Sequence, residues 1–219
     1  MSATVCWSVK GGSGTTVVAA CLALTNPVSQ LLVDLDGDLP GALGLPEPAG
    51  QGLSDWFATD LPAASIEDLA VDVDATTRLI PRGSSPIPPA SPRWDDLADW
   101  MRTTVFDVVV DAGAGALHPA LHTDRAGATL LLVTRACYLG LRRAASASPR
   151  PDGIVLVAEP GRSLQPRDVE HCIGAPVLAT LDVDPAVARA VDAGLLLSRL
   201  PRVVGRSLRL PRPTAPVRP

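Results

Sequence analysis

Six short apolar segments recur along this chain, and none of them alternates between apolar and polar residues. They are ATVCWSV, LLVDLD, VFDVVVD, ATLLLVT, GIVLVA and APVLAT, at residues 3–9, 31–36, 105–111, 128–134, 153–158 and 175–180. A strand with one solvated face shows alternation, whereas a strand covered on both faces is apolar throughout. The segments therefore predict interior strands of a mostly parallel sheet.

The stretches between these segments are long enough for helices. We predict helices at residues 14–24, 94–102, 139–147, 166–172 and 185–197, and a proline-rich surface loop at 81–93. Strands that alternate with helices are typical of an open α/β sheet with helices on both faces. With 219 residues, of which 47% are hydrophobic, the chain can bury one sizeable core. We expect one domain over residues 1–210 and a disordered Pro/Arg tail over 211–219.

The composition argues against several classes of protein. The net charge of −4 argues against a general nucleic-acid-binding surface. No basic leader with a cleavage site precedes the first strand, and no apolar run reaches the roughly 18 residues that span a bilayer, so we expect a cytoplasmic protein. The cysteines are too scattered for a disulfide framework or a zinc site, and we expect buried free thiols at Cys6, Cys21, Cys137 and Cys172.

The C-terminal part is basic although the whole chain is acidic. No acidic residue follows Asp192, whereas six arginines do: Arg199, Arg202, Arg206, Arg209, Arg212 and Arg218. Residues 199–210 are either a helix whose basic face contacts DNA or an anionic membrane, or an ordinary amphipathic helix packed on the sheet.

The first apolar segment runs into a glycine-rich turn with the features of a phosphate-binding loop. A P-loop reads G-x-x-x-x-G-K-[ST]; its backbone amides surround phosphates, its lysine contacts the β- and γ-phosphates, and its hydroxyl binds Mg²⁺. Here Thr15 stands at the lysine position and Thr16 at the hydroxyl position. Lys10, the only lysine among 19 Lys and Arg residues, stands at the head of the turn. The turn therefore keeps the glycines and the hydroxyl of a P-loop, but its positive charge is at position 10 instead of position 15.

Aspartates stand at the ends of two further predicted strands. Asp34, Asp36 and Asp38 lie at the end of the second apolar segment, and Asp111 closes the third. Ligands of open α/β sheets bind outside the carboxyl ends of the strands, where these aspartates would meet the glycine-rich turn. Carboxylates repel a phosphate unless a cation lies between them, so the arrangement indicates Mg²⁺ or an ordered water.

Taken in order along the chain, these motifs resemble those of the ParA/MinD ATPases, whose deviant Walker A motif reads K-G-G-x-G-K-[ST]. The matching stretches are KGGSGTT, LLVDLDGDLPGALGL, VFDVVVDAG, LLVTRACYLGLRRA and GAPVLATLDVDPAVARAVDAGLLLSRLP. The resemblance covers nearly the whole chain and implies a single-domain, Rossmann-like P-loop fold.

The resemblance also implies roles for individual residues. Lys10 matches the lysine that crosses an ATP-sandwiched dimer to reach the partner's phosphates. Asp36 matches the carboxylate that positions the attacking water, Asp111 matches the Walker B aspartate that acts on Mg²⁺ through water, and Thr16 matches the Mg²⁺ ligand. The resemblance implies ATP and Mg²⁺ as cofactors, bound by a loop that consists of Lys10, Gly11, Gly12, Ser13, Gly14, Thr15 and Thr16.

Two departures from the family pattern weaken the expected nucleotide site. Thr15 brings a hydroxyl but no charge, and loss of one such contact typically costs on the order of 10²–10³ in rate. Ala158 and Glu159 stand where the family has an Asn-Arg or Asn-Lys pair that helps to hold adenine. We therefore expect slow or absent hydrolysis, and the nearest resemblance is to TadZ/CpaE-like members with a degenerate P-loop lysine.

Three functions are consistent with these patterns. The first is a nucleotide-binding positioning or partition protein that dimerises and recruits a protein partner to the nucleoid, the pole or the inner membrane surface. The second is a nucleotide-independent scaffold, a pseudo-ATPase, which the two departures favour. The third is a metabolic enzyme of the dethiobiotin synthetase or cobyrinate synthase type, which needs a working P-loop lysine and a substrate loop.

Overall fold

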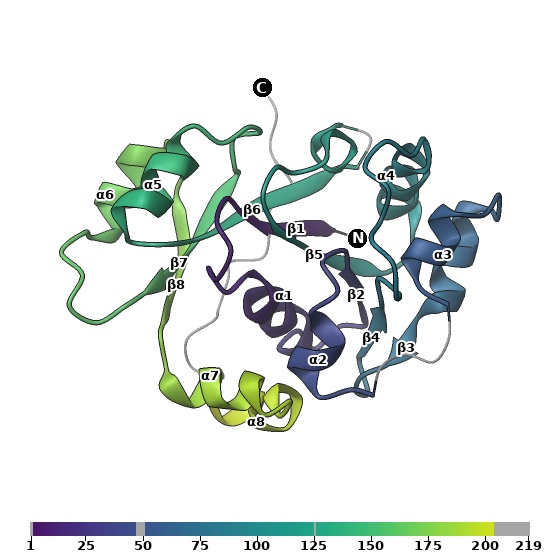
Figure 1. Ribbon diagram of the computed structural model, residues 1–219, viewed down its shortest axis with the longest axis horizontal. Coiled ribbons are helices and arrows are strands. Elements are labelled where there is room, and N and C mark those ends of the chain that lie inside the picture. Colours follow the sequence, from purple (N-terminus) through teal and green to yellow (C-terminus); the bar gives the residue numbers. More distant parts are fainter. Residues whose placement is uncertain (1, 47–50, 125, 204–219) are drawn as a thin grey trace.

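A computed structural model describes residues 2–46, 51–124 and 126–203 (Figure 1). Its strands form one 8-stranded sheet in the order β3-β4-β2-β5-β1-β6-β7-β8. Neighbouring strands are parallel except for β3 and β4. The strands are β1 (Ala3–Ser8), β2 (Gln30–Asp34), β3 (Val71–Asp72), β4 (Thr77–Ile80), β5 (Asp107–Ala114), β6 (Ala128–Arg135), β7 (Gly153–Ala158) and β8 (Val177–Asp182).

Helices cover both faces of this sheet (Figure 1). One face packs against α1 (Thr15–Leu24), α2 (Leu39–Leu43), α7 (Pro185–Asp192) and α8 (Leu196–Val203). The other packs against α3 (Leu53–Phe57), α4 (Arg93–Thr103), α5 (Tyr138–Ala145), α6 (Pro166–Ile173) and the 3-10 helices η1 (Ala63–Leu69) and η2 (Pro119–His122). The predicted fold class, a mostly parallel α/β sheet with helices on both faces, is confirmed.

The central strands are buried as their composition predicts, but the last strand is not. Every residue of β2 is buried, because helices cover both of its faces. Among the described strands β8 pairs only with β7, and its residues are half-buried or exposed. The prediction of an interior strand at 175–180 is therefore wrong: the last apolar segment forms an edge strand.

The helix predicted over residues 185–197 is two helices, α7 and α8. Gly194 lies between them with φ +61°, a left-handed conformation that interrupts a helix. A Cβ added to Gly44, at the end of α2, would overlap the carbonyl oxygen of Gly194. The chain turns here because two glycines allow the backbones of α2 and of the α7–α8 corner to touch.

Sequence patterns missed the segment that contains α2, α3, β3 and β4, because these elements have five residues or fewer. The loop predicted at 81–93 does connect β4 to α4 and is largely exposed. Cys6 and Cys21 are buried as predicted, whereas Cys137 is half-buried and Cys172 is exposed. Neither of the latter is a core residue: Cys137 directly precedes α5, and Cys172 lies on an exposed position of α6.

The described part of the chain contains no helix with the length and hydropathy to cross a bilayer. The predicted tail at 211–219 and the arginines after Arg199 lie outside the residues whose side chains are described.

Candidate functional site

The glycine-rich turn joins the carboxyl end of β1 to the start of α1. Gly12 and Gly14 have φ +74° and +93°, a region that favours glycine. The hydroxyls of Ser13 and Ser8 donate to the Lys10 carbonyl at 2.7 and 3.1 Å, and so hold the turn from within. A Cβ added to Gly11 or Gly12 would meet no atom within 4 Å, so the outer side of the turn is open to a ligand.

The side chains of this turn differ in exposure. Lys10 is exposed, and within residues 2–46, 51–124 and 126–199 its ammonium has no ion-pair partner. Thr15 is only 6% exposed, and Thr16 is half-buried. The sole lysine is therefore free to reach a ligand from the head of the loop, whereas position 15 offers no charge.

Two aspartates face this turn from the middle of the sheet. Asp34 of β2 and Asp111 of β5 are register partners, and both are fully buried. Asp34 Oδ1 accepts hydrogen bonds from the N–H groups of Gly37 and Asp36 at 2.6 and 3.2 Å, and Asp111 Oδ1 accepts from Gly113 N–H at 3.0 Å. Oδ2 of each aspartate is buried and, within the described part of the chain, lacks a hydrogen-bond partner.

Both carboxyls bind protons more tightly than usual. Burial raises the pKa of Asp111 to about 7, although the nearby Thr16 hydroxyl and the Gly113 N–H oppose the shift, and the nearby charges of Asp34 and Asp36 raise it further. Burial likewise raises the pKa of Asp34 to about 6. Burial, then the charge of Asp111, raises the pKa of the adjacent Cys6 thiol. Two buried carboxyls with orphaned oxygens are a good donor set for a hard cation such as Mg²⁺.

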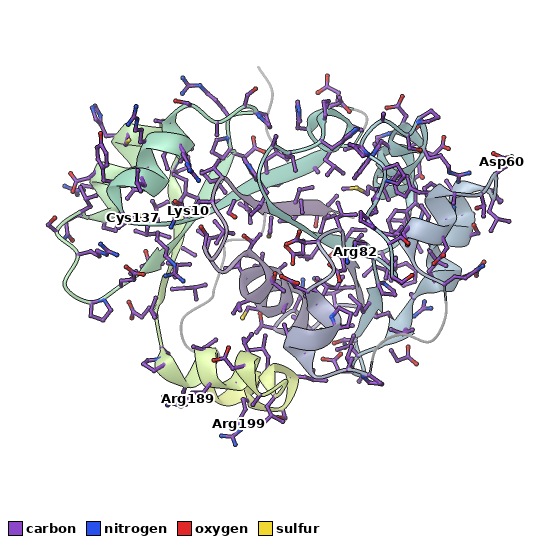
Figure 2. All side chains as sticks on the ribbon, in the orientation of Figure 1. Lys10, Asp60, Arg82, Cys137, Arg189 and Arg199 are labelled. Atoms are coloured by element: carbon purple, nitrogen blue, oxygen red, sulfur yellow. The ribbon has the colours of Figure 1, made fainter. Side chains whose placement is uncertain are left out.

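Asp36 and Arg82 lie at the rim of this acidic pair. The Asp36 carboxyl occupies the space beside Gly113, where an added Cβ would overlap it. Arg82 donates to the Asp36 carbonyl and its guanidinium lies over Gly37. Partial burial and the charge of Asp38 raise the pKa of Asp36, and Arg82 lowers it. Figure 2 shows Lys10 on the β6 side and Arg82 on the β4 side of α1.

Asp111 does not close its strand as the sequence suggested. β5 continues to Ala114 because β1 pairs with it as far as Ser8, with a register shift after Cys6, and Gly115 N–H donates to the Ser8 carbonyl at 2.7 Å. β2, in contrast, ends at Asp34 rather than at Asp36. The glycine-rich turn, Asp34, Asp36 and Asp111 nevertheless converge on one edge, as expected from the sheet type.

The opposite side of the turn is basic. Arg135, the last residue of β6, donates from Nη1 to Glu159 Oε1 at 2.7 Å, and Arg162 Nε donates to Glu159 Oε2 at 2.7 Å. These bonds, led by that of Arg162, lower the pKa of Glu159. Neither Arg82 nor Arg135 was singled out from the sequence, because arginine is common in this chain and local patterns do not show which side chains reach the site.

Solved structures with the same fold are ParA- and MinD-type ATPases. The ParA family ATPase from Chlorobium tepidum TLS aligns with a TM-score of 0.70 at 21% identity, over 94% of this chain and 94% of that chain. The septum site-determining protein MinD from Pyrococcus horikoshii OT3, complexed with Mg-ADP, gives a TM-score of 0.71 at 21% identity, over 90% and 88%.

The MinC:MinD cell division protein complex from Aquifex aeolicus gives a TM-score of 0.68 at 19% identity, over 97% of this chain and 99% of that chain. Comparisons with protein-family models and with curated protein sequences give no match. At these identities the likeness establishes the fold of the chain, whereas its activity has to be argued from its own residues.

Proposed function

We propose that this protein is a ParA/MinD-like nucleotide-binding positioning or partition protein, which dimerises and recruits a protein partner to a site in the cell. One observation carries the proposal: the open glycine-rich turn faces Asp34 and Asp111, each with a buried and unpartnered oxygen, at a single edge of the sheet. The fold of a MinD protein that binds Mg-ADP supports the same reading.

Each residue has a separate task in this proposal. The backbone of residues 11–16 binds the phosphates, since Gly11 and Gly12 leave its outer side open. Thr16 and Asp111 hold Mg²⁺, which when bound offsets the phosphate charge. Asp36, exposed at the rim, orients the attacking water. Hydrolysis is weak because Thr15 brings no positive charge to the transferred phosphoryl group.

The proposal includes a protein partner and a location in the cell. The likeness to a chain of a MinC:MinD complex supports a second protein as partner, and the homodimer follows from the family resemblance. Recruitment to the nucleoid, the pole or the inner membrane surface follows from the same resemblance, and TadZ/CpaE-like members share the loss of the P-loop lysine. The Arg-rich C-terminal segment is the part of the sequence that would contact DNA or anionic lipid.

The alternative is a scaffold that keeps the fold but has lost the nucleotide. Thr15 favours it, and so does Glu159, because that carboxylate is engaged by two arginines instead of offering an amide to adenine. Calorimetric titration with Mg-ATP distinguishes the two functions, since the scaffold binds none.

The role of Lys10 is tested by mass from light scattering with and without Mg-ATP. The parent is expected to dimerise only with nucleotide, and both Lys10→Ala and Lys10→Arg are expected to lose this dimer, because a planar guanidinium does not replace a compact ammonium. Arg189→Ala is the control: it removes an exposed cation from α7, far from Lys10 in Figure 2, and should dimerise like the parent. A parent that dimerises equally without nucleotide, together with an unaffected Lys10→Ala, would support the scaffold.

A further inference from the structure

Arg135 extends a row of side chains that face α1. Leu131 and Val133 of β6 belong to the apolar cluster under α1, and alternate residues of a strand share a face. On β7, Val155 and Val157 belong to the same cluster, and Glu159 continues their row. The 2.7 Å hydrogen bond between Arg135 and Glu159 places both side chains on this face.

This face adjoins the glycine-rich turn. β6 is the direct neighbour of β1, whose carboxyl end leads into the turn. Val157 is the register partner of Arg135, and its Cγ2 lies 3.9 Å from the position of a Cβ on Gly14. Neighbouring strands are about 4.8 Å apart. Arg135 is therefore one strand spacing from the residue that touches the last glycine of the turn.

The charges at this place are not balanced. Glu159 carries one negative charge between the positive charges of Arg135 and Arg162. Nε of Arg135 is buried and has no hydrogen-bond partner in the described ranges, and the side chain as a whole is 39% exposed. A guanidinium has five N–H donors in a rigid fork, so an Arg135 held by Glu159 still has donors for an anion.

We propose that Arg135 supplies the fixed positive charge that Thr15 does not, and that it donates hydrogen bonds to phosphate oxygens of a nucleoside di- or triphosphate held by the turn. Glu159 is the positioning residue that keeps the guanidinium in place. The inference rests on the proposed function, since it needs a phosphate ligand at the turn. It explains how a P-loop without its lysine retains a cation, because arginine pairs readily with phosphate.

The test is calorimetric affinity for two probes, Mg-ATP and inorganic tripolyphosphate. Arg135→Ala should weaken binding of both by about ten- to a hundredfold, the range for a charge-assisted hydrogen bond. Arg135→Gln, which keeps a donor for Glu159 but no charge, should show the same loss. Arg189→Ala, with the same change in net charge on α7, should bind like the parent.

A rescue experiment separates a phosphate contact from a structural role. Thr15→Lys in the Arg135→Ala background should restore binding, since it returns a cation to the turn; failure to rescue would overturn the proposal. So would an Arg135→Ala variant that binds both probes as the parent does, or one that loses ATP but not tripolyphosphate, which lacks a base. If the parent binds neither probe, the nucleotide function falls and this inference falls with it.

Discussion

The carboxylates at the two edges of the sheet differ in burial and in hydrogen bonding. At the amino edge, a cavity of about 1000 Å³ is lined by Asp107 and Asp152. There Asp107 accepts from Ser2 N–H at 2.7 Å and Asp152 accepts from Leu130 N–H at 2.7 Å, so these carboxylates stabilise the chain's own backbone. At the carboxyl edge, Asp34 and Asp111 are fully buried and each keeps an oxygen without a partner in the described residues.

The large cavity and the unsatisfied carboxylates therefore lie at opposite edges of the sheet. Beside the amino-edge cavity, the one buried side-chain atom without a hydrogen-bond partner, within the described ranges, is the neutral Oε1 of Gln30. At the carboxyl edge, Asp34 and Asp111 have lost contact with water, and one oxygen of each carboxyl gains no hydrogen bond in return within the described residues. A protein tolerates this cost where a ligand provides the missing interactions. Unsatisfied charge is therefore the reason to propose the functional site at the carboxyl edge.

The largest expected effect is an increase in the rate of ATP hydrolysis when a cation is added at the carboxyl edge but not at the amino edge. Thr15→Lys should raise ATP hydrolysis on the order of 10²-fold, because the transferred phosphoryl group gains a charge contact. Thr129→Lys adds the same charge beside the amino-edge cavity and should leave the rate unchanged. A steady-state phosphate-release assay measures both. A Thr15→Lys variant no faster than the parent would mean that other changes have disabled the site.

A smaller effect is expected on stability, with opposite signs at the two edges. The pKa of Asp111 is raised to about 7, so the folded protein binds this proton more tightly than the unfolded chain does. The carboxyl therefore costs stability at pH 8, and the cost disappears as the pH falls from about 7 toward 4. Asp111→Asn should raise the free energy of unfolding by about 2 kcal/mol at pH 8, and hardly at pH 4.

At the amino edge, Asp152→Asn should instead lower the free energy of unfolding by about 0.5–1 kcal/mol at pH 8, because it weakens a satisfied hydrogen bond. Urea denaturation in EDTA at both pH values measures the two variants. Destabilisation by Asp111→Asn at pH 8 would show that the buried charge is already compensated, and the contrast between the edges would disappear.

The smallest expected effect is the difference in stability loss between alanine substitutions at two glycines with positive φ. Gly113 has φ +65° beside the Asp36 carboxyl, and Gly127 has φ +58° at the amino edge, with Arg102 Cγ 3.7 Å from an added Cβ. Gly127→Ala should cost about 1 kcal/mol in conformational strain alone. Gly113→Ala should cost about 1 kcal/mol more, since Asp36 must also move. Equal costs in thermal denaturation would indicate that Asp36 has no fixed position.

The sequence predicted the parts of this site that depend on local patterns. The glycine-rich turn follows an apolar strand, and the turn needs its glycines whatever surrounds it, so residues 10–16 were predicted together with α1. Asp36 and Asp111 were predicted as site residues because each lies at the end of an apolar segment. Lys10 was predicted as a site residue because it is the only lysine of the chain and stands at the head of the turn.

The other residues of the site are brought together by contacts between segments that are distant in the sequence. An apolar segment without alternation does not show which of its side chains face which helix. Only the packing of α1 on β6 shows that Leu131, Val133 and Arg135 lie on one face of the sheet. Likewise, Arg82 follows a four-residue strand that sequence patterns missed, and its contact with Asp36 joins residues 46 positions apart.

The sequence by itself determined the class of sheet and predicted a glycine-rich turn with Thr15 in place of a lysine, because composition and short spacing encode these properties. The tertiary structure alone decided that Asp34 lies beside Asp111, that both lose their solvent, and that Arg135 is held by Glu159 on the face of the sheet that α1 covers. The physical reason is that strand register and burial arise from contacts between distant segments, and these contacts set the charge balance of the site.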